Sequence, residues 1–232
     1  MQSGGLFVHS YYYLLFNLLV FVPVLILSFV TDVKPHRHLK ALLGAFLIVC
    51  VPFILWDAWA VHAGHWGFNS NYVLEPRFIN LALEEILFFI TVPFAMIYVW
   101  GVVRKFVDNV QIRTWIPLAL LSLAAGAAGA LLVWYWDRGY TVAAMVATLI
   151  AVVVVGCSNL VFTLRFWVFQ IALLLLFLIA NWVLTDLPII LYSNAEIIGT
   201  KVLSIPLEDF FFNFALINLF LITFNWLDNR LK

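Results

Sequence analysis

Seven long apolar runs divide this chain of 232 residues and limit the folds that it can adopt. A helix needs about 20 apolar residues to cross a bilayer, and only helices or closed barrels satisfy their backbone polar groups within lipid. Stretches such as VVVVGCSNLVF and IALLLLFLIA are continuously apolar, whereas barrel strands alternate. The sequence therefore predicts an all-α integral membrane protein with seven transmembrane helices, at about residues 11–30, 41–61, 79–103, 115–136, 141–163, 166–185 and 204–227.

The composition agrees with this class and excludes others. Hydrophobic residues make up 66% of the chain and charged residues 10%, against about 25% charged in a typical soluble domain. The net charge of zero leaves no basic surface for nucleic acid. No polar stretch is long enough for a soluble domain, so residues 1–232 are expected to form a single membrane domain. Cys50 and Cys157 lie singly in apolar runs and are interpreted as small buried hydrophobes, not as disulfide or metal ligands.

Basic residues predict the orientation of the spans. Nine lie on one side of the membrane, namely Lys34, Arg37, Lys40, Arg104, Lys105, Arg113, Arg165, Arg230 and Lys232. Only Arg77, Arg138 and Lys201 lie on the other side. By the positive-inside rule, we expect a multi-pass protein of the cell membrane with its N-terminus outside and its C-terminus in the cytoplasm. Residues 1–10 contain no Lys or Arg, so the first run is expected to be a span and not a cleaved leader.

Two segments of the chain resemble each other at a constant spacing of 124 residues. LALEEILFF (81–89) aligns with IPLEDFFFN (205–213), which pairs Glu84 with Glu208 and Glu85 with Asp209. The same spacing pairs further polar and aromatic residues across the preceding helix and loop, namely Asp57 with Asn181, Phe68 with Tyr192, Arg77 with Lys201, and Asn80 with Ser204. The sequence therefore predicts a duplicated three-helix unit.

The helix count fixes how the two units are related. Repeat one spans about 11–103 and repeat two about 141–227, with a linking helix at about 115–136. Because three spans and the linking helix make an even number, both repeats enter the membrane in the same direction and are parallel. The four carboxyl groups of the two acidic pairs are then expected at one depth in the outer half of the membrane.

Acidic residues within membrane helices are rare, because an Asp or Glu at a helix centre costs about 2.5–3.5 kcal/mol on insertion scales. One alternative is that these acids lie at the interface and pair with Arg77 and Lys201, although short acidic side chains reach the interface poorly. Helical spacing places Asn80, Glu84, Phe88 and Thr91 on one stripe, and Ser204, Glu208, Phe212 and Ala215 on another. In such a dry, aromatic setting, one carboxyl of a pair can stay protonated while its neighbour is ionised, as acid–base catalysis requires.

Aromatic residues, 17% of the chain, include candidates for binding a substrate. Most are expected to contact lipid or to form interfacial belts, among them Trp56, Trp59, Trp66, Phe68, Tyr72 and Tyr192. The rings beside the acids are better candidates, because a ring face stabilises positive charge where water is absent. These substrate-binding candidates are Phe88, Phe89, Phe210, Phe211 and Phe212. Acids, rings and carboxylates in this combination favour carbocation chemistry on an alkene.

Several cofactor-dependent functions lack their sequence motifs. GAAG (126–129) lies inside an apolar helix and is typical of close helix packing, not of a nucleotide-binding turn. The five histidines are too few and too separated for a membrane di-iron centre, and residues 204–227 contain no lysine that could hold retinal. No DxxxD motif is present to bind a diphosphate through metal ions. We expect no cofactor and no metal.

The chain resembles the small integral-membrane lycopene cyclases, which occur as paired short chains or as fused single chains. That family carries two copies of a P-x-E-[ED]-x-x-F-F motif, one in each half. IPLEDFFFNF (205–214) fits the second copy closely, preceded by NAEIIGTKV (194–202) and LIANWVLTDLPIILYS (178–193). In the first half, WDAWAVHAGHWGFN (56–69) is followed by LALEEILFF, in which Ala82 replaces the motif proline.

The resemblance implies a lycopene β-cyclase of the isomerase, or intramolecular lyase, type in carotenoid biosynthesis. Its substrate would be lycopene, whose open ψ ends become β-ionone rings without redox change or cofactor. By this resemblance, Glu84 or Glu208 donates the proton, and Glu85 or Asp209 acts as base or sets its partner's protonation. Polar residues expected to support the site are Asp57, Asn181, Asn80, Ser204, Arg77 and Lys201.

Two other functions stay open from the sequence. In a carotenoid 1,2-hydratase or another carotenoid end-group enzyme, water would capture the same cation. A proton-coupled transporter also places acids at a repeat interface, although transporters commonly have inverted repeats or broken helices.

Overall fold

The structure is a computed structural model that describes residues 10–231, and this range contains seven helices long and apolar enough to cross a membrane. The first span is α2 (Tyr12–Val30). The second, Pro35–Ala63, joins η1 (Pro35–His38), α3 (Leu39–Ala45), a π-helical turn η2 (Phe46–Cys50) and α4 (Val51–Ala63). The others are α5 (Leu83–Phe106), α6 (Trp115–Trp134), α7 (Gly139–Gly156), α8 (Leu164–Asp186) and α9 (Leu207–Arg230). The all-α class and the seven spans are confirmed. The expectation of an uncleaved N-terminus, and the basic Lys232, concern residues outside the described range.

Two predicted helix starts are wrong, because a tight turn precedes α5 and α9. Phe78 and Leu81 bridge each other around Ile79 and Asn80, which both have positive φ. Before α9, strands β3 (Lys201–Val202) and β4 (Ile205–Pro206) pair around Leu203, which also has positive φ. Asn80 and Ser204 therefore lie in turns and not on the predicted helical stripes.

Two predictions near the end of α7 are also corrected. The fifth span ends at Gly156 and not at about 163, because the Ser158 and Thr163 side chains cap the 3-10 turn η3 (Asn159–Phe162) and helix α8. Cys157 lies at this break and is exposed, so its assignment as a buried hydrophobe is wrong. Cys50 is buried, as expected.

The 124-residue spacing recurs in the bounds of several elements. Helices α5 and α9 begin 124 residues apart and end 124 residues apart. The same spacing relates β1 (Trp66–Phe68) to β2 (Ile190–Tyr192), and these strands pair antiparallel with Gly67 opposite Leu191. Corresponding residues thus meet as they would around a local two-fold axis through the centre of this ladder. The parallel three-helix repeat stays a prediction, which this spacing supports.

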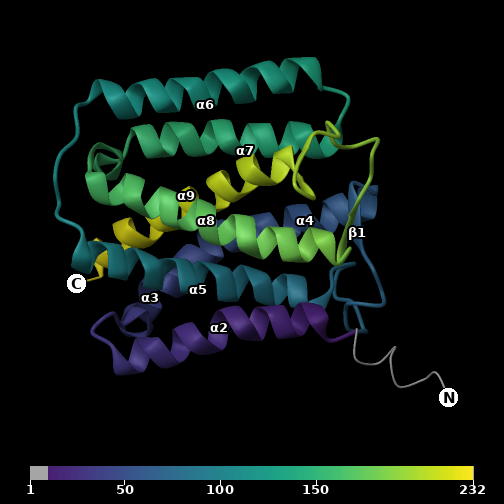
Figure 1. Cartoon of the computed structure of the whole chain (residues 1–232), viewed down its shortest axis with the longest axis horizontal. Helices are drawn as coiled ribbons and strands as arrows, with labels where there is room; N and C mark the ends of the chain where they lie inside the picture. The colour runs from purple at the N-terminus through teal and green to yellow at the C-terminus, as the bar shows by residue number, and fades with distance from the viewer. Residues whose placement is uncertain (1–9, 232) are drawn as a thin grey trace.

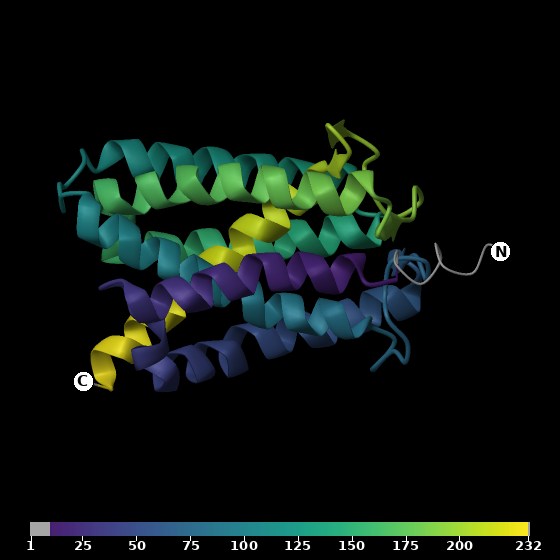
Figure 2. The ribbon, with the colours of Figure 1, turned by 60° about the horizontal axis from the view of Figure 1, so that its bottom comes forward.

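The helices form an elongated bundle, with α6 along one edge and α2 along the opposite edge in Figure 1. Helix α9 crosses the bundle obliquely in both ribbon views and packs against α7 and α3 (Figures 1 and 2). Helices α5, α7 and α9 are the most buried, whereas α2, α6 and α8 expose many apolar side chains. These exposed apolar faces are suited to contact with lipid.

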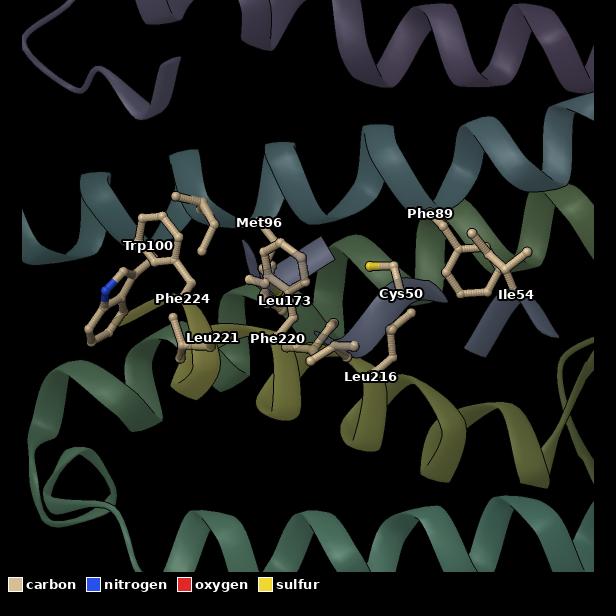
Figure 3. Close-up of a cluster of buried hydrophobic side chains, with 14 of the residues drawn as sticks. Cys50, Ile54, Phe89, Met96, Trp100, Leu173, Leu216, Phe220, Leu221 and Phe224 are labelled. Carbon is tan, nitrogen blue, oxygen red and sulfur yellow. The ribbon is translucent and has the colours of Figure 1, made fainter. Parts of the chain in front are cut away.

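Apolar side chains of α5, α9 and the second span fill the centre of the bundle (Figure 3). Phe89 lies beside Ile54 and Cys50, while Trp100 lies beside Phe224 towards the other end of the same cluster. Both acidic pairs precede this core, because they occupy the first turns of α5 and α9. Arg104, Lys105 and Arg230 occupy the last turns. The two acidic pairs and these three basic residues thus lie at opposite ends of the bundle.

Gly101 of α5 allows a close approach of the loop between the first two spans. A Cβ atom at this position would overlap Cγ1 of Val33, whereas a Cβ at Gly126 of α6 would meet no atom within 4 Å. We expect Gly101→Ala to lower the thermal unfolding midpoint, since overpacking costs about 1–3 kcal/mol and outweighs a helix-propensity gain of up to about 1 kcal/mol. Gly126→Ala changes helix propensity without this overlap, so the Gly126→Ala protein should unfold at or above the wild-type temperature. A Gly101→Ala protein that melts no lower than wild type would contradict this packing.

Candidate active site

Glu84 and Glu208, the first acid of each pair, are fully buried in the first turns of α5 and α9. Glu84 Oε1 accepts a hydrogen bond of 2.8 Å from the backbone N–H of Leu74, and Glu208 Oε1 accepts one of 2.6 Å from that of Ile198. Leu74 and Ile198 are themselves 124 residues apart. Each glutamate therefore hydrogen bonds to the loop that precedes its own helix and holds this loop in place.

The second carboxyl oxygen of each glutamate, unlike the first, accepts no hydrogen bond from the described residues. Glu84 Oε2 and Glu208 Oε2 are buried, and neither has a hydrogen-bond partner among the described residues. A buried polar atom without a partner costs about 1–3 kcal/mol. The two halves of the chain thus hold an unpaired carboxyl oxygen at corresponding positions.

Glu85, the second acid of the first pair, lies among polar groups of two other helices. The Tyr13 hydroxyl of α2 donates a hydrogen bond of 2.7 Å to Glu85 Oε2. The carboxyl group of Asp57, on α4, is within hydrogen-bonding reach of the Glu85 carboxyl. All three side chains are buried. The structure therefore brings Asp57 to the first acidic pair, as the sequence predicts.

Asp209, the second acid of the other pair, accepts three hydrogen bonds from neutral side chains. Tyr140 of α7 donates to Oδ1 at 2.6 Å, while Asn181 of α8 and Tyr192 of β2 each donate to Oδ2 at 2.7 Å. Burial raises the pKa of Tyr192 well above its ordinary value, and the charge of Asp209 adds to the effect. Tyr192 therefore remains a protonated donor, and Asn181 takes the place that Asp57 has in the first half.

The two acidic pairs belong to one polar cluster. The charge of Asp209 acts on both Asp57 and Glu85, and Tyr192 lies within range of all three carboxyl groups. The ring of Tyr192 stacks on Tyr140 with centroids 5.9 Å apart. The β1–β2 ladder joins the loops of the two halves at this end of the bundle (Figure 1). The site can therefore hold and move protons within a largely buried network.

Aromatic rings form a cage beside the second acidic pair. The ring of Phe212 lies 5.3 Å from Phe53 and 5.2 Å from Trp56, and Trp56 lies 6.2 Å from Tyr140. The indole Nε1 of Trp56 is buried and has no hydrogen-bond partner among the described residues. Such a cage offers ring faces to a positively charged intermediate.

The other phenylalanines of the two motifs have different surroundings. Phe88 contacts Phe89 edge to face, and Phe89 is a fully buried member of the apolar core (Figure 3). Phe210 packs edge to face on Phe177, and Phe211 packs against a smaller cluster around Met145. Phe212 thus contacts two rings of the cage, Phe53 and Trp56.

Four predicted supporting residues make no hydrogen bond to the acidic pairs within residues 10–231. Arg77 donates to the Phe68 carbonyl and to Ser70, and it pairs with Glu75. Lys201 and Asn80 are exposed, and the Ser204 hydroxyl lies 2.7 Å from that of Thr185. The structure therefore does not pair the acids with Arg77 and Lys201, which was the interfacial alternative.

Sequence reasoning missed several groups that contact the acids. Tyr13 and Tyr140 are each the second residue of their helix, and Thr141 donates to Glu208 Oε1 at 2.6 Å. Tyr192 was assigned to an interfacial belt, but its hydroxyl faces Asp209. Tyr13 and Tyr140 are 127 residues apart, so the 124-residue spacing does not pair them, although each lies close to the start of a predicted span.

His65 lies beside this end of the bundle with its imidazole buried between Trp59 and Trp66. Its Nε2 atom lies 3.6 Å from Glu196 Oε2, and its Nδ1 atom has no hydrogen-bond partner among the described residues. Burial lowers the pKa of His65, although the charge of Glu196 acts in the opposite direction. The folded protein therefore favours neutral His65.

Comparison with known families gives a match over most of the chain. A family model described as "Lycopene cyclase" matches residues 10–103 and 137–227. Each matched region contains one acidic pair, and residues 104–136, which include α6, separate the two regions. Searches of curated proteins and of solved structures gave no match.

The burial of His65 predicts a pH-dependent stability. Because the folded state lowers its pKa, stabilisation by neutral His65 is complete above the ordinary histidine pKa of about 6.5 and is lost as the pH falls further. We expect the wild-type thermal unfolding midpoint to fall between about pH 7.5 and about pH 5.5, and that of His65→Gln to fall less. His62→Gln, at an exposed position, should keep the wild-type slope. Equal slopes for wild type and His65→Gln would exclude this role of His65.

Proposed function

This chain belongs to the lycopene cyclase family, and we propose that it is a lycopene β-cyclase that closes the open ψ ends of lycopene into β-ionone rings. The family implies an enzyme of carotenoid cyclisation that works on a carotenoid in a membrane. The proposed reaction is an isomerisation without redox change or cofactor. A proton adds to the terminal double bond, the neighbouring double bond attacks the resulting tertiary cation, and a proton leaves the closed ring.

The observation that carries this proposal is the pair of buried carboxyl oxygens without partners, Glu84 Oε2 and Glu208 Oε2. An alkene has no lone pair to accept a hydrogen bond, so an acid that protonates it must keep its O–H free of stronger acceptors. An unpaired buried oxygen is also less costly on a neutral carboxylic acid than on a carboxylate. We therefore assign proton donation to Glu84 and Glu208.

We propose that neighbouring acids and aromatic rings accept the departing proton and stabilise the cation. Glu85 and Asp209 are buried carboxyl groups that can take up the departing proton or balance the charge of the cation. The rings of Phe88, Phe89, Phe210, Phe211 and Phe212 are the proposed contacts of the polyene, and the cage around Phe212 and Trp56 best suits its cationic end.

The arrangement of charges supports the proposed orientation in the cell membrane. The acidic turns of α5 and α9 lie at one end of the bundle, and the basic last turns of these helices lie at the other. We propose that the basic end faces the cytoplasm and that the N-terminus lies outside. The site would then be in the outer half of the bilayer.

Expression in a host that accumulates lycopene tests this function. The wild-type chain should convert lycopene to cyclic products of unchanged mass, whereas a hydratase would add water to the mass. Unchanged lycopene in cells with confirmed membrane expression would refute the proposal. Uptake of a substrate driven by a proton gradient, without any change in carotenoids, would favour a transporter.

Substitution of the two glutamates tests the assignment of the proton donors. We expect Glu84→Gln and Glu208→Gln each to reduce cyclisation about 100-fold or more at the ring ends that they serve, because general acid catalysis contributes about 10²–10⁴-fold. Glu75→Gln is a matched control, since Glu75 is exposed and lies outside both pairs. Full activity of the double variant Glu84→Gln and Glu208→Gln would show that the proton comes from another group.

A further inference from the structure

The two halves of the acidic cluster differ at two corresponding positions. At the 124-residue spacing, Asp57 corresponds in sequence to Asn181, and Phe68 corresponds to Tyr192. The second half therefore has two hydrogen-bond donors, an amide and a phenol, where the first half has a carboxyl group and an apolar ring. Both halves have a tyrosine that donates to the second acid of the pair: Tyr13 donates to Glu85, and Tyr140 donates to Asp209.

Three neutral donors surround the carboxyl group of Asp209. Tyr140 occupies Oδ1, while Asn181 and Tyr192 occupy Oδ2. Hydrogen bonds donated to a carboxylate favour its charged form. If Asp209 took up a proton, one of these donors would lose its acceptor in a buried site, which costs about 1–3 kcal/mol.

The first half offers fewer donors to two carboxyl groups. Tyr13 donates to Glu85 Oε2, and we find no N–H or O–H donor to the Asp57 side chain among residues 10–231. Asp57 and Glu85 nevertheless lie within hydrogen-bonding reach of each other. Two carboxylates cannot hydrogen bond to each other, so this contact requires a proton on one of them, as in other buried carboxyl dyads.

We propose that the two halves are chemically unequal, with one proton shared between Asp57 and Glu85 and with Asp209 held as a carboxylate by its three donors. The part of these groups in turnover rests on the proposed cyclase function. In ring closure, the Asp57–Glu85 dyad accepts the proton that leaves the ring, and Asp209 balances the charge of the cation.

This assignment balances the protons of the reaction. Glu84 or Glu208 loses one proton to the alkene and becomes a carboxylate, while the dyad gains the proton lost by the ring and becomes neutral. Return of one proton from the dyad to the glutamate restores the starting state. The cycle needs no other reactant.

Infrared spectroscopy of the purified chain in lipid nanodiscs tests the sharing of the proton without any substrate. Protonated carboxyl groups absorb separately from carboxylates, so Asp57→Asn should remove one such absorption. Asn181→Asp is the matched control, because it places a second carboxyl beside Asp209 and should add one. Asp209→Asn should remove none. Loss of the absorption in Asp209→Asn, or its retention in Asp57→Asn, would overturn the proposal.

A second variant guards against an effect of misfolding. Tyr13→Phe keeps both carboxyl groups of the dyad and removes only the donor to Glu85, so the absorption should remain and shift in frequency. Its disappearance in folded Tyr13→Phe protein would contradict a proton held between Asp57 and Glu85.

Carotenoid analysis in a lycopene-accumulating host tests the role of the dyad in turnover. We expect Asp57→Asn to slow cyclisation about 100-fold or more. A wild-type chain that leaves lycopene unchanged would refute the cyclase function itself and would leave the infrared result intact. A cyclising wild type with an equally active Asp57→Asn variant would instead refute the role of the dyad alone.

Discussion

The burial of carboxyl groups inside an apolar helical bundle is the constraint on which the rest of this structure depends. Each acidic pair lies in the first turn of a helix, where backbone N–H groups lack intrahelical partners and the helix dipole favours negative charge. The loops before these helices fold back so that Leu74 and Ile198 donate to Glu84 and Glu208. The β1–β2 ladder then joins the two loops. The irregular part of the chain is thus organised around the acids.

The turns that lead into α5 and α9 contain strained backbone, and the placement of the acids explains why this strain is present. Ile79, Asn80 and Leu203 adopt positive φ, which costs about 1–3 kcal/mol for residues other than glycine. These turns are held by the Phe78–Leu81 bridge and by the β3–β4 pair. The tight reversal allows the helix to start one or two residues before the acids, so that their side chains point into the bundle. Such strain is common next to functional sites, where precise placement has priority over local stability.

The sequence predicted the large features because the bilayer imposes them, and it missed details that depend on local geometry. Apolar length predicted seven spans, and the repeated acidic pairs predicted where polar groups gather. Asn80 and Ser204 were misplaced because helical periodicity does not detect a turn that interrupts it. Tyr192 resembles any interfacial tyrosine in the sequence, and only the folded loop shows that its hydroxyl reaches Asp209. Cys157 was misplaced because the end of α7 is set by side-chain caps inside an apolar run.

A reaction that consumes and releases one proton suits a site in which several carboxyl groups are buried together. In the proposed reaction, the proton that the alkene gains from one carboxyl is matched by the proton that another carboxyl receives, so a cycle needs no exchange with bulk water. Water would also be harmful, because it can capture the carbocation and divert it to an alcohol. Glu85 Oε2 and both carboxyl oxygens of Asp209 are already paired with protein donors, which leaves these atoms little affinity for water. In the proposed reaction, the unpaired oxygens of Glu84 and Glu208 are the ones left for the substrate, and we propose that the pairing of the neighbouring acids favours ring closure over hydration.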